Sequence, residues 1–261
     1  MPPSVILAAF DIIIAICKKS GNYTEDDIKV MVGIAFDTAF PLVDFNGDLV
    51  QFCGSNPSGH PLTVVINSLV NSLYIRYAYA TLNPKERSAR DFKKNVALQT
   101  YGDDNVFGVK QGCEWFNHTS VAGALADIGI TYTMADKDAE SVPYIHIDEV
   151  SFLKRVWRFD EDLQHYVCPL DEDSIAKMLT LHIPSKEDPV QKQTVDVLST
   201  VTREYFWYGR ETFEKKRAMC IRFATELGLM DIWVQQSTFP TWEQLAEQYA
   251  QSSARRLHFK W

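Results

Sequence analysis

Two adjacent carboxylates, Asp103 and Asp104, are the residues of this sequence best suited to chemistry. They lie between two short apolar runs, 96–98 and 106–109, in the pattern of a strand, a tight turn and a second strand. Neighbouring carboxylates repel each other, so a positive partner is expected at the turn, most simply a divalent metal. Because Mg²⁺ prefers carboxylate oxygens together with substrate phosphates, we predict metal-assisted phosphoryl or nucleotidyl transfer. The alternative is an ordinary Gly-Asp turn on a surface hairpin.

A second group of candidate residues precedes this hairpin. Ser58 and Gly59 lie in a loop before a predicted long helix, in which Thr63 and Asn67 are four residues apart and share one face. Glycine allows the loop backbone to approach a phosphate or sugar closely. Asn67 offers both a donor and an acceptor to a ribose hydroxyl. The alternative is that Thr63 and Asn67 are polar positions on an exposed helix face.

Basic candidates follow the hairpin. Lys137 comes after a predicted strand over residues 130–134 and could donate a proton to a departing pyrophosphate. Lys154 and Arg155 follow Phe-Leu at a second predicted tip and could grip a nucleic-acid backbone electrostatically. The alternatives are a surface lysine and an amphipathic strand with solvated basic residues.

Local signals predict the elements that must position these residues. Pro2 and Pro3 suit the first turn of a helix that runs to about Lys19 and stops at Gly21-Asn22, and Thr24 caps a second helix. Asn46-Gly47 between two apolar runs predicts a hairpin. The further predicted elements are a hairpin over 94–109, a helix over 114–127, a hairpin over 152–159, and helices over 172–181, 190–208, 210–227 and 242–251.

The fold class expected from this order is α+β. Residues 1–163 mix strands with helices, whereas residues 164–261 are predicted to be helical. The chain has 261 residues, of which 46% are hydrophobic, enough for one large or two small domains. The longest apolar run, from Val5 to Ile16, contains Asp11 and is too short to span a membrane. Pro2-Pro3 before it is not the charged region that begins a signal peptide, so we do not expect one.

Charge and cysteine usage narrow the function classes. The net charge of −8 argues mildly against nucleic-acid binding. Local basic clusters weaken that objection, although each is also typical of a solvated face. These clusters are Lys85, Arg87, Arg90, Lys93 and Lys94; Lys154, Arg155 and Arg158; and Lys215, Lys216, Arg217 and Arg222. The five cysteines are scattered singly, which favours reduced thiols and argues against a structural zinc site.

The motifs occur in a specific order: Ser-Gly-x-x-x-Thr-x-x-x-Asn from Ser58, Tyr-Gly-Asp-Asp from Tyr101, Ala-Asp-Lys from Ala135 and Phe-Leu-Lys-Arg from Phe152. This series resembles the successive palm motifs of RNA-dependent RNA polymerases of picorna-like positive-strand RNA viruses. The motifs cover about residues 1–160. The resemblance implies a partial polymerase palm over residues 1–163, an antiparallel sheet with flanking helices, followed by an all-helical thumb over 164–261.

The resemblance also implies a two-metal mechanism with Mg²⁺, or Mn²⁺ as an alternative. Asp103 would be the principal metal ligand of this motif and Asp104 the weaker one. Nucleotide positioning and selection of ribose would belong to Ser58, Gly59, Thr63 and Asn67. Lys137 would be the general acid, and Lys154 and Arg155 would hold the nascent strand. The implied partners are RNA template and primer, nucleoside triphosphates and a viral replication complex in the host-cell cytoplasm.

One departure from the family pattern concerns the metal ligands. In this family a further carboxylate comes from an earlier palm motif, which is expected before the helix that begins at Pro2. Neither Asp11 nor Asp37 has the required context. The finger residues are also missing. We therefore expect a truncated polymerase that needs an upstream segment as a partner and is inactive alone.

Two alternatives come from other classes. The chain could be a non-catalytic RNA-binding or scaffolding module that uses its basic tips. A reverse transcriptase also uses an aromatic-x-Asp-Asp hairpin, but the Ser-Gly-x-x-x-Thr-x-x-x-Asn helix argues against it.

Overall fold

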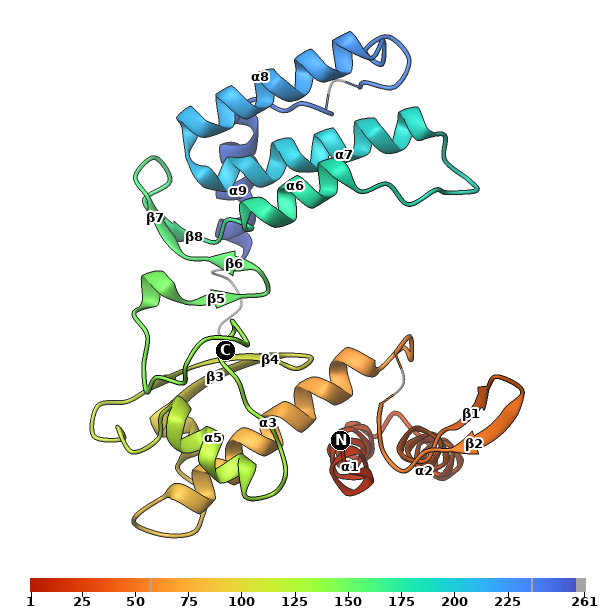
Figure 1. The fold of residues 1–261 in the computed structure, drawn as a ribbon, viewed down its shortest axis with the longest axis vertical. Helices are drawn as coiled ribbons and strands as arrows, with labels where there is room; N and C mark the ends of the chain where they lie inside the picture. Colours follow the sequence, from red (N-terminus) through yellow and green to blue (C-terminus); the bar gives the residue numbers. More distant parts are fainter. Residues whose placement is uncertain (57, 236, 257–261) are drawn as a thin grey trace. The chain divides into compact units, whose positions relative to one another are not determined.

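The computed structural model describes residues 1–256 apart from Pro57 and Gln236, and only the backbone of residues 253–256. Contacts divide the chain into two compact units, Met1–Ile145 and His146–Trp261 (Figure 1). The chain contains both helices and small antiparallel sheets, which is compatible with the predicted α+β class. The division between units comes earlier than the predicted boundary at 163/164. Within the described residues, no helix has both the length and the apolar character needed to cross a membrane.

The first unit is built around one long helix. Its elements are α1 (Pro3–Ser20), α2 (Glu25–Ala39), β1 (Leu42–Phe45), β2 (Asp48–Gln51), α3 (Thr63–Leu82), α4 (Phe92–Asn95), β3 (Val96–Tyr101), β4 (Asp104–Val109) and α5 (His118–Ala126). One hydrophobic cluster joins α3 to α1 and α2, and another joins it to α4, β3 and α5. Figure 1 shows α3 running between these two groups of elements. Helix α3 is therefore the support that both groups share.

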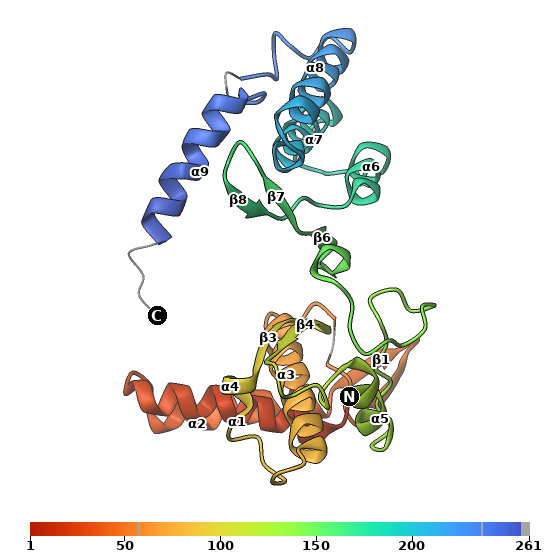
Figure 2. The same ribbon diagram turned by 90° about the vertical axis from the view of Figure 1, so that its left-hand side faces the viewer.

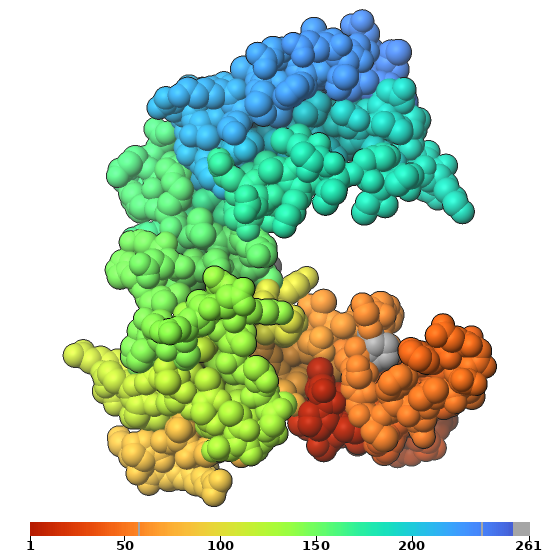
Figure 3. Space-filling view, viewed as in Figure 1, coloured from red at the N-terminus to blue at the C-terminus, as the bar shows by residue number. Residues whose placement is uncertain are grey.

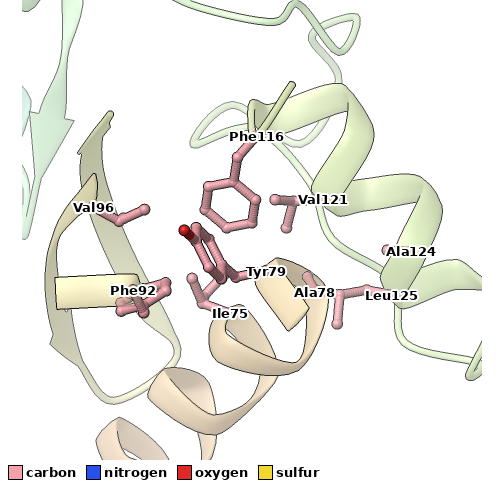
Figure 4. Packing of buried hydrophobic residues seen from close by; sticks show 9 residues of the cluster. All are labelled: Ile75, Ala78, Tyr79, Phe92, Val96, Phe116, Val121, Ala124 and Leu125. Carbon is pink, nitrogen blue, oxygen red and sulfur yellow. The ribbon is translucent and has the colours of Figure 1, made fainter. Parts of the chain in front are cut away.

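The cluster between α3, α4, β3 and α5 contains three aromatic rings that pack together (Figure 4). Tyr79 of α3 lies at its centre, with edge-to-face contacts to Phe92 at 5.2 Å and to Phe116 at 5.3 Å between ring centroids. All three side chains are at most 2% exposed. Such ring geometry is favourable beyond the burial of area. The cluster holds β3 and α5 against α3.

Several element ends are confirmed with their predicted causes. Helix α1 begins just after Pro2 and ends before Gly21, whose φ is 71°. Thr24 caps α2 through a reciprocal pair of hydrogen bonds with Asp27, a capping box. Asn46 and Gly47 have φ values of 55° and 95°, as a two-residue hairpin turn with both central residues at positive φ requires.

The structure differs from the predictions over residues 114–134 in two places: a strand is absent and a helix starts later. The predicted strand over 130–134 is irregular backbone, fixed instead by side-chain contacts of Tyr132. The helix predicted from residue 114 begins later, at His118. Its start is set by Asn117 and Ser120, which form a capping box that the sequence reading overlooked.

The second unit combines two short hairpins with helices. Its elements are η1 (Ile147–Glu149), β5 (Ser151–Phe152), β6 (Arg155–Val156), β7 (Arg158–Asp160), β8 (His165–Val167), α6 (Glu172–Thr180), α7 (Val190–Tyr205), η2 (Phe206–Tyr208), α8 (Arg210–Glu226) and α9 (Trp242–Arg256). Helices α7 and α8 lie side by side (Figure 2). The single hairpin predicted over 152–159 is in fact two hairpins, β5–β6 and β7–β8. Strand β8 also begins the region predicted to be all-helical.

Candidate active site

The adjacent carboxylates lie at the predicted hairpin turn. Tyr101 pairs with Asp104 across β3 and β4, which leaves Gly102 and Asp103 as a two-residue loop. Gly102 has a φ of 60°, the conformation that favours glycine at the first loop position. Both Asp103 and Asp104 are exposed. The hairpin therefore presents two carboxylates to solvent at its tip.

Helix α3 contacts the backbone of this turn. The amide of Gly102 donates to Ser68 Oγ at 2.8 Å, and that hydroxyl donates onward to the carbonyl of Val64 at 2.6 Å. One helical turn along, Asn71 Nδ2 donates to the carbonyl of Asp103 at 2.8 Å. The tip is thus anchored to the helix that carries the predicted nucleotide-binding residues.

A cavity of about 280 Å³ lies beside the turn. Asp103 and Asn67 both line it, so the structure brings together two of the residues singled out in the sequence. Its other walls come from the N-terminus, α3, β4, α5 and the segment after α5: Met1, Val70, Asn71, Tyr74, Ile75, Asn105, Leu125, Ile130, Thr131 and Tyr132. In the space-filling view, the red N-terminal residues lie at the surface of the first unit between its orange and green parts (Figure 3).

The loop before α3 orders the upstream candidates. Asn56 Nδ2 donates to Asn67 Oδ1 at 3.0 Å and to the carbonyl of Thr63 at 3.2 Å. Thr63 is the first residue of α3, and its hydroxyl donates to the carbonyl of His60 at 2.8 Å. Asn67 Oδ1 accepts the hydrogen bond from Asn56 Nδ2. The amide nitrogen of Asn67 is the atom that can donate to a ligand.

Ser58 and Gly59 are exposed in the same loop. Gly59 has a φ of 89°, and a Cβ built there would meet no atom within 4 Å. The glycine is therefore needed for its backbone angle, and the space beside it is open to a ligand.

Lys137 lies in the exposed turn that follows the irregular segment 130–134. In that turn the amide of Asp138 donates to Asp136 Oδ1 at 3.1 Å. The side chain of Lys137 is thus on the surface of the first unit, in a polar loop.

Lys154 and Arg155 belong to the second unit and differ in environment. Lys154 is exposed at the β5–β6 turn, where Leu153 and Lys154 have φ values of 55° and 61°. Arg155 makes two 2.9 Å contacts with the carboxylate oxygens of Glu204 in α7, and it donates to the carbonyl of Cys168 at 2.9 Å. The hydrogen bonds that Arg155 donates to the Glu204 carboxylate raise the pKa of Arg155. The guanidinium is therefore occupied within its own unit.

The carboxylates at the turn fit one kind of metal site. Their oxygens are the ligands that Mg²⁺ takes, and both side chains are accessible. Among the residues that the structure describes, no group of three or more His, Cys, Asp or Glu could hold a metal ion. Asp103 and Asp104 could therefore supply two oxygen ligands to a metal, as part of a larger ligand set.

Sequence reasoning missed Asn71, Asn105 and Tyr132, which surround the turn. Asn71 could have been noticed, because it continues the Thr63–Asn67 stripe by one more helical turn. Asn105 and Tyr132 gave no local signal, since their contacts join segments that are 27 to 34 residues apart.

Comparison with known proteins identifies relatives of this chain. The sequence profile of viral RNA-dependent RNA polymerases matches residues 1–222. The replicase polyprotein of Cricket paralysis virus is 29% identical over 203 residues, or 75% of this chain and 11% of that polyprotein. The Drosophila C virus replicase polyprotein is 32% identical over 180 residues, or 67% of this chain and 10% of the polyprotein. The RNA1 polyprotein of Cherry rasp leaf virus is 36% identical over 173 residues, or 63% of this chain and 8% of that polyprotein. The chain thus spans about a tenth of the length of these polyproteins.

Proposed function

The chain belongs to the viral RNA-dependent RNA polymerase family, and we propose that its first unit carries part of a nucleotidyl-transfer site that extends RNA on an RNA template. The observation that carries this proposal is the anchored hairpin tip, where Asp103 and Asn67 line one cavity. The substrates would be an RNA template and primer together with nucleoside triphosphates. The setting would be a viral replication complex in the host-cell cytoplasm.

In this proposal Asp103 and Asp104 hold the metal ions. Bound Mg²⁺, or Mn²⁺ in its place, would activate the primer 3′-hydroxyl and offset the charge of the triphosphate. Asp103 is the principal metal ligand in this proposal, because it is the loop residue that lines the cavity. In this proposal a further carboxylate, which the family resemblance assigns to an earlier palm motif, joins the pair at the turn.

The loop before α3 and the start of α3 bind the incoming nucleotide. Ser58 and Gly59 would contact its phosphates or sugar, with open space beside Gly59, and Thr63 supports the helix end beside them. Asn67 presents its amide nitrogen, which suits a ribose hydroxyl as acceptor. Lys137 is the proposed general acid for the pyrophosphate. The second unit is the proposed thumb, and the first the proposed palm.

The proposal is tested by primer extension on an RNA template. The chain is assayed alone and together with the residues that precede the aligned region of the Cricket paralysis virus replicase polyprotein. We expect no extension by the chain alone and ribonucleotide incorporation by the complemented chain. Extension by the chain alone would refute the need for an outside carboxylate.

The same assay separates the alternatives. Preferential incorporation of deoxyribonucleotides would favour a reverse transcriptase. No extension in either form, with salt-dependent RNA binding that survives Asp103→Ala, would favour the non-catalytic RNA-binding module.

The contrast between Lys154 and Arg155 gives a further prediction. Lys154 is the proposed contact to the RNA backbone, whereas Arg155 supports it by joining β6 to α7. We expect Lys154→Ala to lower the salt slope of RNA binding by about 1. Its free energy of unfolding should change by less than about 0.5 kcal/mol.

Arg155→Leu should instead lower the free energy of unfolding by about 1–2 kcal/mol, because it leaves Glu204 half-buried and unpaired. Binding across a salt series and urea titration measure the two quantities. An Arg155→Leu protein with unchanged stability but weakened RNA binding would show that the guanidinium contacts RNA directly.

A further inference from the structure

Three backbone carbonyls of the β3–β4 turn converge on one side chain. Asn71, which is 9% exposed, has its Nδ2 at 2.8 Å from the carbonyl oxygen of Asp103 and 3.1 Å from that of Asp104. The carbonyl of Gly102 is the third, at 3.3 Å. The amide has two hydrogens for three acceptors, so the two shorter contacts are the strong ones. A carbonyl of this turn left unpaired would carry a desolvation cost.

The orientation of the Asn71 amide is fixed by a chain of donors and acceptors. Tyr132 donates its hydroxyl hydrogen to Asn105 Oδ1 at 2.7 Å. Asn105 Nδ2 donates to Asn71 Oδ1 at 3.0 Å. Carbonyls only accept, so the nitrogen of Asn71 must face the turn and its oxygen must face Asn105. Burial raises the pKa of Tyr132 to about 12, so its hydroxyl stays protonated even in mildly alkaline solution.

Ser68 binds an N–H group of the same turn, whereas Asn71 binds its carbonyl groups. Its Oγ accepts from the amide of Gly102, while Asn71 donates to the carbonyls. Ser68 and Asn71 are three residues apart and share one face of α3. A two-residue loop that is hydrogen-bonded to α3 through both an N–H and its C=O groups has little freedom to move relative to that helix. The directions in which Asp103 and Asp104 project are therefore set by α3.

We propose that Asn71 is a positioning residue for RNA synthesis: it fixes the backbone of residues 102–104 and thereby aims the Asp103 and Asp104 carboxylates. Asn71 lines the cavity, but its amide nitrogen is engaged by the turn and its amide oxygen by Asn105. The proposal rests on the proposed function of Asp103. Small misplacements of reacting groups cost large factors in rate, and the groups that orient metal ligands matter nearly as much as the ligands.

The first test is kinetic and uses the complemented chain. Asn71→Leu keeps the approximate volume but removes the donor, and we expect kcat for extension to fall about 10²-fold. The KM for nucleotide should stay within about threefold, because both ends of the Asn71 amide are engaged by the turn and by Asn105. Asn95→Leu is the matched control: it removes a part-buried amide that donates to the Tyr79 hydroxyl at 2.7 Å, away from the turn. This control should leave kcat unchanged.

The second test needs no activity. Hydrogen exchange of the chain itself should be at least about tenfold faster at residues 101–105 in Asn71→Leu, and unchanged in the β1–β2 hairpin. Tyr132→Phe removes only a hydroxyl and should cause a smaller loss of kcat in the same direction. Added to Asn71→Leu, it should cause no further loss, because both act through one chain of hydrogen bonds. If Asn71→Leu fails to fold, kcat and hydrogen exchange at residues 101–105 can both still be measured in Tyr132→Phe.

The outcomes separate this inference from the function on which it rests. Unchanged exchange at residues 101–105 would overturn the positioning role, whatever the activity. An unchanged kcat in Asn71→Leu would also overturn it, provided that Asp103→Asn abolishes extension. If Asp103→Asn leaves extension intact, the proposed function fails, and the exchange measurement still decides whether Asn71 holds the turn.

Discussion

Asp103→Asn should reduce primer extension by the complemented chain on the order of 10³-fold or more. The substitution keeps the size of the side chain and removes the charge that a metal ion requires. Asp104→Asn should cost only about 10- to 10²-fold, because Asp104 closes the β ladder opposite Tyr101 and takes the smaller share of metal binding. Single-turnover extension at saturating nucleotide and graded Mg²⁺ measures both effects.

The chain contains a matched control for this comparison. Asp48 follows the two-residue turn of the β1–β2 hairpin and pairs with Phe45, as Asp104 pairs with Tyr101. Asp48→Asn should therefore leave extension unchanged. Equal losses from Asp48→Asn and Asp103→Asn would indicate a general effect of charge removal and contradict the assigned role of Asp103.

Phe116→Ala should lower the free energy of unfolding by about 3–5 kcal/mol. Phe116 is fully buried and contacts the rings of Tyr79, Phe107 and Trp115. Its removal leaves a cavity at the junction of α3, β4 and α5. Urea denaturation followed by circular dichroism measures the loss.

Phe45→Ala is the control for that experiment, since Phe45 is 60% exposed on β1. Its free energy of unfolding should change by less than about 0.5 kcal/mol. A loss of less than about 1 kcal/mol in Phe116→Ala would mean that the aromatic cluster does not stabilise the first unit as described.

Local chemistry explains which parts of this fold could be predicted from sequence. The start of α2 at Thr24 and the turn at Asn46-Gly47 depend on residues within a few positions of each other, and both predictions are confirmed. The strand predicted over 130–134 is wrong because its apolar pattern serves packing by Tyr132, and no neighbouring strand pairs with it among the described residues.

The candidate site divides in the same way. The hairpin tip at Asp103 follows from its flanking apolar runs, and Asn67 from its spacing to Thr63. The contacts that hold these groups connect distant segments, such as Asn71 to the turn or Arg155 to Glu204, 49 residues apart. Such pairs have no signature in local spacing.

The hydrogen bonds from Asn71 end on main-chain oxygens, and every residue type supplies the same oxygen. The hydrogen bonds that place the loop therefore do not depend on which side chains stand at positions 103 and 104. Substitutions there should alter the chemistry while the tip keeps its geometry, so a carboxamide or a thiol introduced at either position would occupy the place of the carboxylate. The backbone of the hairpin tip can therefore position different functional groups at these two positions without changing its own conformation.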